Sequence, residues 1–267
     1  MEARWLVEEL SDGPWPAVLS EPVTARAGIR FEELLERRAN GEPFQYVLGH
    51  WPFRKLDLMV DRRVLIPRPE TEVVVEVALA ELDGLGRAPA VAPAVAVDLG
   101  TGSGAIALSL VAERSGVEVW ATDASSGALS VARANLAGLG APAARVRLAE
   151  GSWWDALPRT LAGRIDLAVS NPPYVSSGEM VALDPGVTEW EPRTALEAGP
   201  FGTEEVGTIL REARAWLAPR ASIVVEIAPH QAGEVRELAL DAGFLEMEVR
   251  PDLAGRDRVF VARTAPL

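Results

Sequence analysis

The chain has 267 residues, 48% of them hydrophobic, which suits a globular protein with one substantial core and a small additional domain. Its formal net charge of −13 at pH 7 disfavours a nucleic-acid binder, because such proteins usually carry a basic surface that neutralises phosphates. The chain has no cysteine, which excludes disulfide and thiol chemistry, and its two histidines lie far apart, so we expect no metal site.

Residues 1–50 are predicted to form a small helical domain. Residues 4–10 and 31–37 both place apolar side chains at helical spacing, and segments with glycine and proline interrupt the pattern after each. The first residues show no basic stretch followed by an apolar one, and no run of about 18 apolar residues occurs. We therefore expect a cytoplasmic protein without membrane contact.

Residues 51–70 are predicted to form a β-hairpin that links the helical domain to the rest of the chain. Residues 53–60 alternate apolar and polar side chains as a strand does, and residues 61–63 turn into a second apolar stretch at 64–66. A helix is predicted to follow over residues 72–82.

Strands and helices alternate through residues 71–267, which we assign to one domain with a doubly wound α/β sheet. The strand patterns fall at residues 94–97, 117–121, 145–148, 165–170 and 222–227, with a closing hairpin of 246–250 and 258–262. The helical patterns fall at residues 105–111, 125–138, 204–217 and 231–242. Ligands bind such sheets at the carboxyl ends of the strands, where the strand order reverses, and we expect the first and fourth strands to flank that point.

A glycine-rich turn follows the first of these strands. Residues 97–104, Val-Asp-Leu-Gly-Thr-Gly-Ser-Gly, end the strand and open the next helix, so backbone can approach a ligand closely near a helix N-terminus. The second strand ends at Asp123, whose carboxylate is suited to accept both hydroxyls of a ribose. Because Gly100, Gly102 and Ala105 also fit the dinucleotide fingerprint, this turn alone does not separate NAD from S-adenosylmethionine, or either from a tight turn without ligand.

The fourth strand ends in Asn171-Pro172-Pro173-Tyr174. The two prolines fix their φ angles and carry no N–H, and the first of them pushes Asn171 toward extended backbone. The stiff turn offers two acceptors, the Asn171 side-chain oxygen and the Pro172 carbonyl, with the aromatic face of Tyr174 beside them. This arrangement suits a planar NH2 group, since each of its hydrogens needs an acceptor, although an ordinary loop is the alternative.

Together the two motifs resemble those of the amino-methyltransferases. These enzymes transfer a methyl group from S-adenosylmethionine to an NH2 nitrogen that is conjugated with a π system. Their known targets are adenine N6, cytosine N4, guanine N2 and the glutamine side-chain amide. The two motifs by themselves do not choose among these targets.

Four further segments narrow the resemblance to the bacterial release factor glutamine methyltransferases, the PrmC or HemK-type family. They are residues 43–49 (Pro-Phe-Gln-Tyr-Val-Leu-Gly), 65–72 (Leu-Ile-Pro-Arg-Pro-Glu-Thr-Glu), 191–196 (Glu-Pro-Arg-Thr-Ala-Leu) and 255–258 (Gly-Arg-Asp-Arg). The likeness runs in register over nearly the whole chain. Residues 65–72 discriminate best, because the sibling family that methylates a ribosomal-protein glutamine more often has Pro-Arg-Ser-Pro there.

The resemblance implies the seven-stranded, mostly parallel sheet of a class I methyltransferase, with an N-terminal domain that docks the substrate. It implies S-adenosylmethionine as cofactor and class I peptide chain release factors as protein substrates, methylated on the glutamine of a Gly-Gly-Gln motif, without direct nucleic-acid contact. Carried over by position, the cofactor contacts are Gly100, Thr101, Gly102, Ser103, Gly104, Asp123, Trp153 and Asn171. The catalytic residues are Asn171, Pro172 and Tyr174, and the substrate glutamine is held by Asn171, Pro172, Pro173 and Tyr174.

The chain departs from the family pattern at three places. It begins at the position of the family's second helix, Ser152 replaces an acidic residue that often precedes the tryptophan, and residues 198–202 replace the usual Gly-x-Asp-Gly. Three alternative functions stay open: a ribosomal-protein glutamine methyltransferase, a nucleic-acid amino-methyltransferase acting on adenine N6, and a catalytically silent S-adenosylmethionine-binding adaptor.

Five polar residues outside the two motifs have two interpretations each. Arg68, Glu70 and Thr71 either line the mouth of the pocket or start a helix, with Thr71 as its cap. Glu226 and Gln231 match the family pattern near the fifth strand, but a capping or core-edge role is favoured for both.

Overall fold

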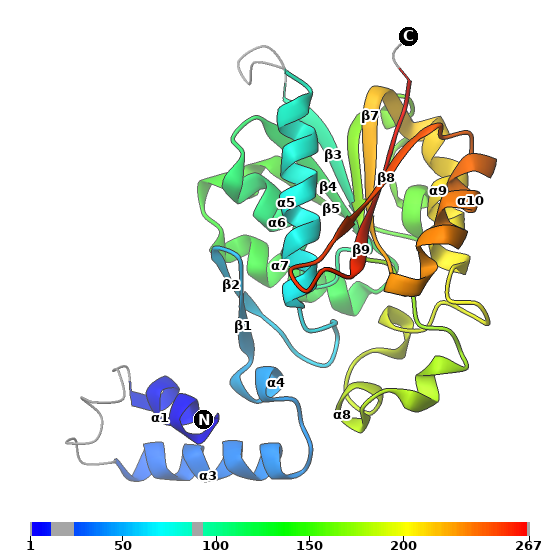
Figure 1. Ribbon diagram of the computed structural model, residues 1–267. Helices are drawn as coiled ribbons and strands as arrows, with labels where there is room; N and C mark the ends of the chain where they lie inside the picture. Colours follow the sequence, from blue (N-terminus) through cyan, green and yellow to red (C-terminus); the bar gives the residue numbers. More distant parts are fainter. Residues whose placement is uncertain (1, 12–23, 87–92, 266–267) are drawn as a thin grey trace.

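The computed structural model describes residues 2–11, 24–86 and 93–265 (Figure 1). Its centre is a seven-stranded sheet in the order β5-β4-β3-β6-β7-β9-β8, parallel except where β9 pairs with β7 and β8. The strands are β3 (Ala94–Leu99), β4 (Val117–Asp123), β5 (Val146–Glu150), β6 (Ile165–Ser170), β7 (Leu217–Glu226), β8 (Glu246–Pro251) and β9 (Asp257–Arg263). The predicted doubly wound sheet with its closing hairpin is confirmed.

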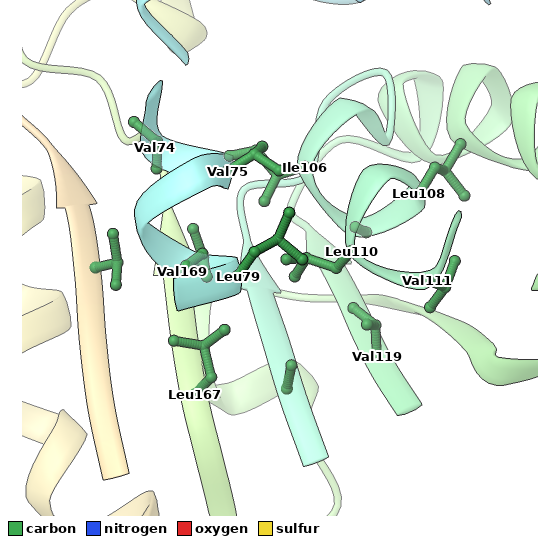
Figure 2. Close-up of a cluster of buried hydrophobic side chains, with 14 of the residues drawn as sticks. Val74, Val75, Leu79, Ile106, Leu108, Leu110, Val111, Val119, Leu167 and Val169 are labelled. Atoms are coloured by element: carbon green, nitrogen blue, oxygen red, sulfur yellow. The ribbon is translucent and has the colours of Figure 1, made fainter. Parts of the chain in front are cut away.

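Helices cover both faces of this sheet. They are α5 (Pro69–Gly84), α6 (Ala105–Glu113), α7 (Ser126–Gly138), α9 (Glu204–Trp216) and α10 (Ala232–Asp241), with a short α8 (Pro185–Thr188). Leu167 and Val169 of β6 join the core formed with α5 and α6, part of which Figure 2 shows, whereas Ile165 and Ala168 join the core formed with α9 and α10. Because both faces of the strand are covered, all of β6 is buried and reads as one apolar run.

The N-terminal region has a small core of its own. Its elements are α1 (Glu2–Ser11), α3 (Ala25–Ala39), α4 (Phe44–Leu48), β1 (His50–Phe53) and β2 (Leu56–Met59). Leu6, Leu34, Phe44 and Val47 pack together in this core. In Figure 1 these helices lie apart from the sheet, with the hairpin of β1 and β2 between them and it. The helical character predicted for residues 4–10 and 31–37 is confirmed.

The hairpin itself differs from the predicted one. Residues 53–60 are not one strand, because the chain reverses at Arg54 and the two arms are β1 and β2; residues 64–66 form no strand. Arg54 takes a φ angle of 53°, and its guanidinium donates to Glu113 at 2.6 Å and to the Glu72 carbonyl at 3.1 Å. Contacts with residues far along the chain hold this turn, and an alternating pattern does not contain them.

Local signals set the start of two helices that border the carboxyl edge of the sheet. α5 begins at Pro69, three residues before its predicted start, since the fixed φ angle of proline suits the first helical position. α7 is capped by the Ser125 hydroxyl, which accepts the Ala128 N–H at 3.1 Å. Within the described ranges no helix is long and apolar enough to cross a membrane, and no group of side chains is arranged to hold a metal ion.

Candidate active site

The glycine turn and the turn at Asn171 leave the sheet side by side. Leu99 of β3 and Ser170 of β6 are register partners, and the Ser170 hydroxyl donates to the Leu99 carbonyl at 2.7 Å. Gly100 and Asn171 are the next residues of these two parallel strands, so both turns start at the same edge. The strand order reverses between β3 and β6, as predicted for the first and fourth strands.

A buried carboxylate holds the glycine turn. Asp98 Oδ2 accepts the Thr101 hydroxyl at 2.6 Å and the Ala107 N–H at 3.1 Å. Burial raises the pKa of Asp98 to about 7, although these two hydrogen bonds act in the opposite direction. Asp98 Oδ1 is buried and has no hydrogen-bond partner among the described residues. Within the described part of the chain, one oxygen of this carboxylate is therefore without a hydrogen bond.

The backbone of the glycine turn is open at Gly102. The φ angles of Gly100, Gly102 and Gly104 are 75°, 56° and 87°, a range that favours glycine. A Cβ placed on Gly102 would meet no atom within 4 Å. The two oxygens of Asp123 accept the N–H groups of Gly102 and Ser125, at 2.9 and 2.8 Å. Each oxygen keeps a further lone pair, so both remain able to accept a ligand hydroxyl.

Trp153 and Trp154 are neighbours in the sequence but lie in different surroundings. The Trp153 ring lies 3.1 Å from the position that a Cβ on Gly100 would take, and its Nε1 donates to Glu205 at 2.8 Å. Trp154 is fully buried and stacks on Trp216, with ring centroids 6.0 Å apart. Of these two neighbours, Trp153 borders the glycine turn and Trp154 belongs to the core.

A chain of side-chain hydrogen bonds fixes Asn171. Its Nδ2 donates to Thr71 Oγ1 at 3.1 Å, and Thr71 donates to Glu226 at 2.7 Å. The other oxygen of Glu226 accepts the Tyr174 hydroxyl at 3.3 Å. Burial raises the pKa of Glu226 to about 7, against its hydrogen bonds and the charge of Arg258, which lower it. Asn171 Oδ1 receives no hydrogen bond from any residue in the described ranges, so it is available to a ligand.

A second set of contacts holds the end of this turn. Gln231 Nε2 donates to the carbonyls of Tyr174 and Gly202, at 2.9 and 3.0 Å. Its Oε1 accepts the Ala228 N–H and so caps a short 3₁₀ helix, as predicted. A Cβ on Gly202 would lie 2.8 Å from the Tyr174 carbonyl oxygen. The departure from the family pattern at residues 198–202 therefore keeps a glycine where the turn requires one.

The structure decides how the polar residues at the start of α5 are used. Thr71 does not cap the helix, because the capping position belongs to Arg68 and the Thr71 side chain is engaged in the hydrogen-bond chain just described. Arg68 pairs with the buried Glu191, and Glu70 pairs with Arg256 at 3.1 Å. Both residues thus tie α5 to neighbouring loops.

The sequence around Glu226 carries a signal of a functional role. Glu226 is the one charged residue in the apolar stretch 223–227, and a carboxylate in a buried strand needs hydrogen-bond partners. It caps no described helix and lies buried at the carboxyl end of β7. Sequence alone did not reveal that Thr71, 155 residues earlier, supplies its partner.

Two models of known domains match parts of this chain. Residues 2–49 match the PrmC N-terminal domain, and residues 87–184 match the methyltransferase small domain.

Full-length relatives match most of it. The release factor glutamine methyltransferase of Cereibacter sphaeroides is 41% identical and aligns with 92% of this chain and 83% of its own length. The enzyme of the same name from Moorella thermoacetica is 42% identical, with the same two coverages. That of Neisseria gonorrhoeae is 38% identical over 98% of this chain and 93% of its own.

Solved structures support the class of fold. The hMettl16 catalytic domain superposes with a TM-score of 0.57 at 14% identity, over 91% of this chain and 82% of that one. A methyltransferase from Pyrococcus furiosus gives a TM-score of 0.55 at 17% identity, over 91% of this chain and 100% of that one. These likenesses concern the fold alone, and they confirm the predicted class I methyltransferase sheet.

Proposed function

The chain belongs to the release factor glutamine methyltransferase family, and from this premise we propose that it methylates the amide nitrogen (N5) of the glutamine in the Gly-Gly-Gln motif of class I peptide chain release factors. S-adenosylmethionine is the methyl donor. The observation that carries the proposal is the pairing of two turns at one edge of the sheet. One turn leaves the backbone open at Gly102, and in the other Asn171 Oδ1 accepts no hydrogen bond from the described residues.

The residues of the glycine turn fit S-adenosylmethionine. The backbone at Gly102 leaves room for close approach, and Asp123 keeps lone pairs for two ribose hydroxyls. Trp153 adds an aromatic surface beside the turn. When bound, S-adenosylmethionine supplies an electrophilic methyl group on its sulfonium. We propose as its contacts Gly100, Thr101, Gly102, Ser103, Gly104, Asp123, Trp153 and Asn171.

The second turn, at Asn171, provides acceptors that make an amide nitrogen a better nucleophile. Such a nitrogen is a poor nucleophile, because its lone pair is delocalised into the carbonyl. When Asn171 Oδ1 and the Pro172 carbonyl accept hydrogen bonds from its two N–H groups, electron density on the nitrogen rises and the amide plane is fixed. Positioning of this kind removes roughly 7–11 kcal/mol of a barrier. Acceptors preorganised where positive charge develops contribute about 3 kcal/mol, by analogy with oxyanion-hole donors.

We also propose that residues 1–50 dock the release factor and that residues 51–70 connect them to the methyltransferase domain, residues 71–267. A cavity of about 350 Å³ lies between the N-terminal helices and the loop around α8, with Trp5 and Val187 in its lining. Trp5 is 41% exposed, and charged side chains such as Glu2 and Arg38 line the same cavity, so the lining offers one aromatic and several polar contacts to a protein partner. An enzyme of translation termination acts in the cytoplasm, where we place this protein.

The decisive experiment offers several acceptors to one enzyme. The protein is mixed with labelled S-adenosylmethionine and, separately, with unmethylated release factor, ribosomal protein and DNA from one host. We expect mass spectrometry to find a methyl on the Gly-Gly-Gln glutamine alone. A methyl on the ribosomal protein or on adenine would replace the proposal with one of the alternatives, and cofactor binding without transfer would favour the adaptor.

A further inference from the structure

We propose that Glu226 is a positioning residue that acts through Thr71 to set which way the Asn171 side-chain amide faces. In this orientation Oδ1, and not Nδ2, meets the substrate. The inference rests on the proposed function, which assigns the NH2 group of the substrate glutamine to Asn171.

The direction of the hydrogen bonds follows from donor and acceptor types. An ionised carboxylate only accepts, so the Thr71 hydroxyl donates to Glu226, 2.7 Å away. With its single proton used, Thr71 Oγ1 offers only lone pairs to its other neighbour. Asn171 therefore turns its donor Nδ2 to Thr71, at 3.1 Å, and its acceptor Oδ1 away from Thr71. A flipped amide would set its own NH2 group against that of the substrate.

Burial leaves the hydrogen-bond chain without substitutes. Thr71 is 4% exposed and Glu226 is 1% exposed, so bulk water does not reach either side chain to replace a lost partner. The same carboxylate accepts the Tyr174 hydroxyl at 3.3 Å. One buried group thus restrains both ends of the turn that begins at Asn171.

Protonation of Glu226 removes the constraint reversibly. A protonated carboxyl donates as well as accepts, so Thr71 gains the option of donating to Asn171 Oδ1, and the amide loses its defined direction. The charged and titratable groups that face this carboxyl are Glu70 from α5, Tyr174 from the turn after β6, and Arg258 from β9. Since burial raises the pKa of Glu226 to about 7, the change falls in an accessible pH range.

NMR reports this orientation without any substrate. The chain has three asparagines, so labelling asparagine with ¹⁵N gives three side-chain NH2 signal pairs. The pH is varied from about 5.5 to about 8.5, which spans about 1.5 pH units on either side of the pKa of Glu226. We expect the chemical shifts of the Asn171 pair to change over this range in wild type and to stay constant in Glu226→Gln. The exposed Asn40 and the doubly bonded Asn135, which donates to the carbonyls of Met59 and Ser103, are internal controls and should not move.

Two variants at Thr71 test the consequence for transfer. Thr71→Val keeps the shape but removes the acceptor for Asn171, so we expect kcat on the release factor to fall about tenfold or more. The dissociation constant of S-adenosylmethionine should stay within about threefold, which is less than 1 kcal/mol. Thr71→Ser retains the hydroxyl and should recover most of the loss.

The inference would be overturned by an Asn171 NH2 signal that neither Glu226→Gln nor Thr71→Val changes, or by full turnover in Thr71→Val. If Glu226→Gln does not fold, Thr71→Val is used for both measurements, the Asn171 NH2 signal and kcat. A wild-type protein that transfers no methyl to the release factor would contradict the proposed function instead. The NMR result would then still decide how Asn171 is oriented.

Discussion

Two buried carboxylates support the two halves of the site, and they differ in how far along the chain their partners lie. Asp98 bonds Thr101 and Ala107, three and nine residues away, whereas Glu226 bonds Thr71 across 155 residues. Burial raises the pKa of both carboxyl groups to about 7. The glycine turn is held by its own strand-turn-helix unit and by the end of the neighbouring strand β4. The acceptor turn depends on three segments that lie farther apart along the chain.

This difference separates binding of the donor from transfer of the methyl group. Changes near the glycine turn should weaken cofactor binding and leave saturated turnover nearly intact. Changes near Asn171 should do the reverse.

The largest expected effect is at Asn171. Asn171→Ala removes the acceptor proposed to hold the substrate amide, so kcat should fall by about 10²–10³-fold, as when an oxyanion-hole donor is lost. Cofactor affinity, measured by calorimetry, should fall only a few-fold, because Asn171 is one of several proposed cofactor contacts. Asn40→Ala is the matched exposed control. Undiminished turnover in Asn171→Ala would contradict the proposed chemistry.

Glu226 should give a pH-dependent stability. The pKa of Glu226 is raised from 4.5 in the unfolded chain to about 7 in the folded protein, so the folded state binds the proton more tightly. Proton binding therefore stabilises folded wild type at low pH, and this contribution is lost as the pH rises from 4.5 through 7. Glu226→Gln does not titrate, and its stability relative to wild type should therefore rise by up to about 3 kcal/mol between pH 4.5 and pH 8.

Denaturant unfolding of both proteins across this range measures the difference, in which the titrations of groups that do not interact with Glu226 cancel. A difference that is flat with pH would mean that Glu226 is not perturbed by its burial.

Asp123 tests the cofactor half of the site, where a substitution should weaken cofactor binding more than it lowers kcat. Asp123→Ala removes the proposed acceptor for the ribose hydroxyls and should raise the dissociation constant of S-adenosylmethionine by about 10–100-fold, equivalent to about 1.4–2.8 kcal/mol. The kcat at saturating cofactor should stay within a few-fold of wild type. A large loss of kcat with unchanged affinity would break the division between the two halves.

Gly202 should show the smallest effect, through stability and turnover together. Gly202→Ala combines a φ angle of 84° with a Cβ 2.8 Å from the Tyr174 carbonyl oxygen, and should cost about 1–2 kcal/mol in unfolding free energy. Gly163→Ala is the control, because its φ angle is 69° but its Cβ would meet nothing within 4 Å. Equal losses of stability and activity in the two variants would show that the contact with Tyr174 is unimportant.

Prediction from sequence succeeded where a pattern is complete within a few residues. β6 was predicted at the same residues that the structure assigns, because a fully buried strand reads as an apolar run and two prolines end it. The hairpin of β1 and β2 was predicted wrongly, since the left-handed turn at Arg54 is held by Glu72 and Glu113 from other elements.

The same distinction holds for the site. The glycine turn and the acceptor turn could be recognised in the sequence, because glycine and proline restrict their own backbone wherever they stand. Their proximity could be inferred, since parallel strands end at a common edge. The orientation of the Asn171 amide could not, because it depends on a hydrogen-bond chain through Thr71 and Glu226, whose donors and acceptors come within reach only when α5, β6 and β7 pack together.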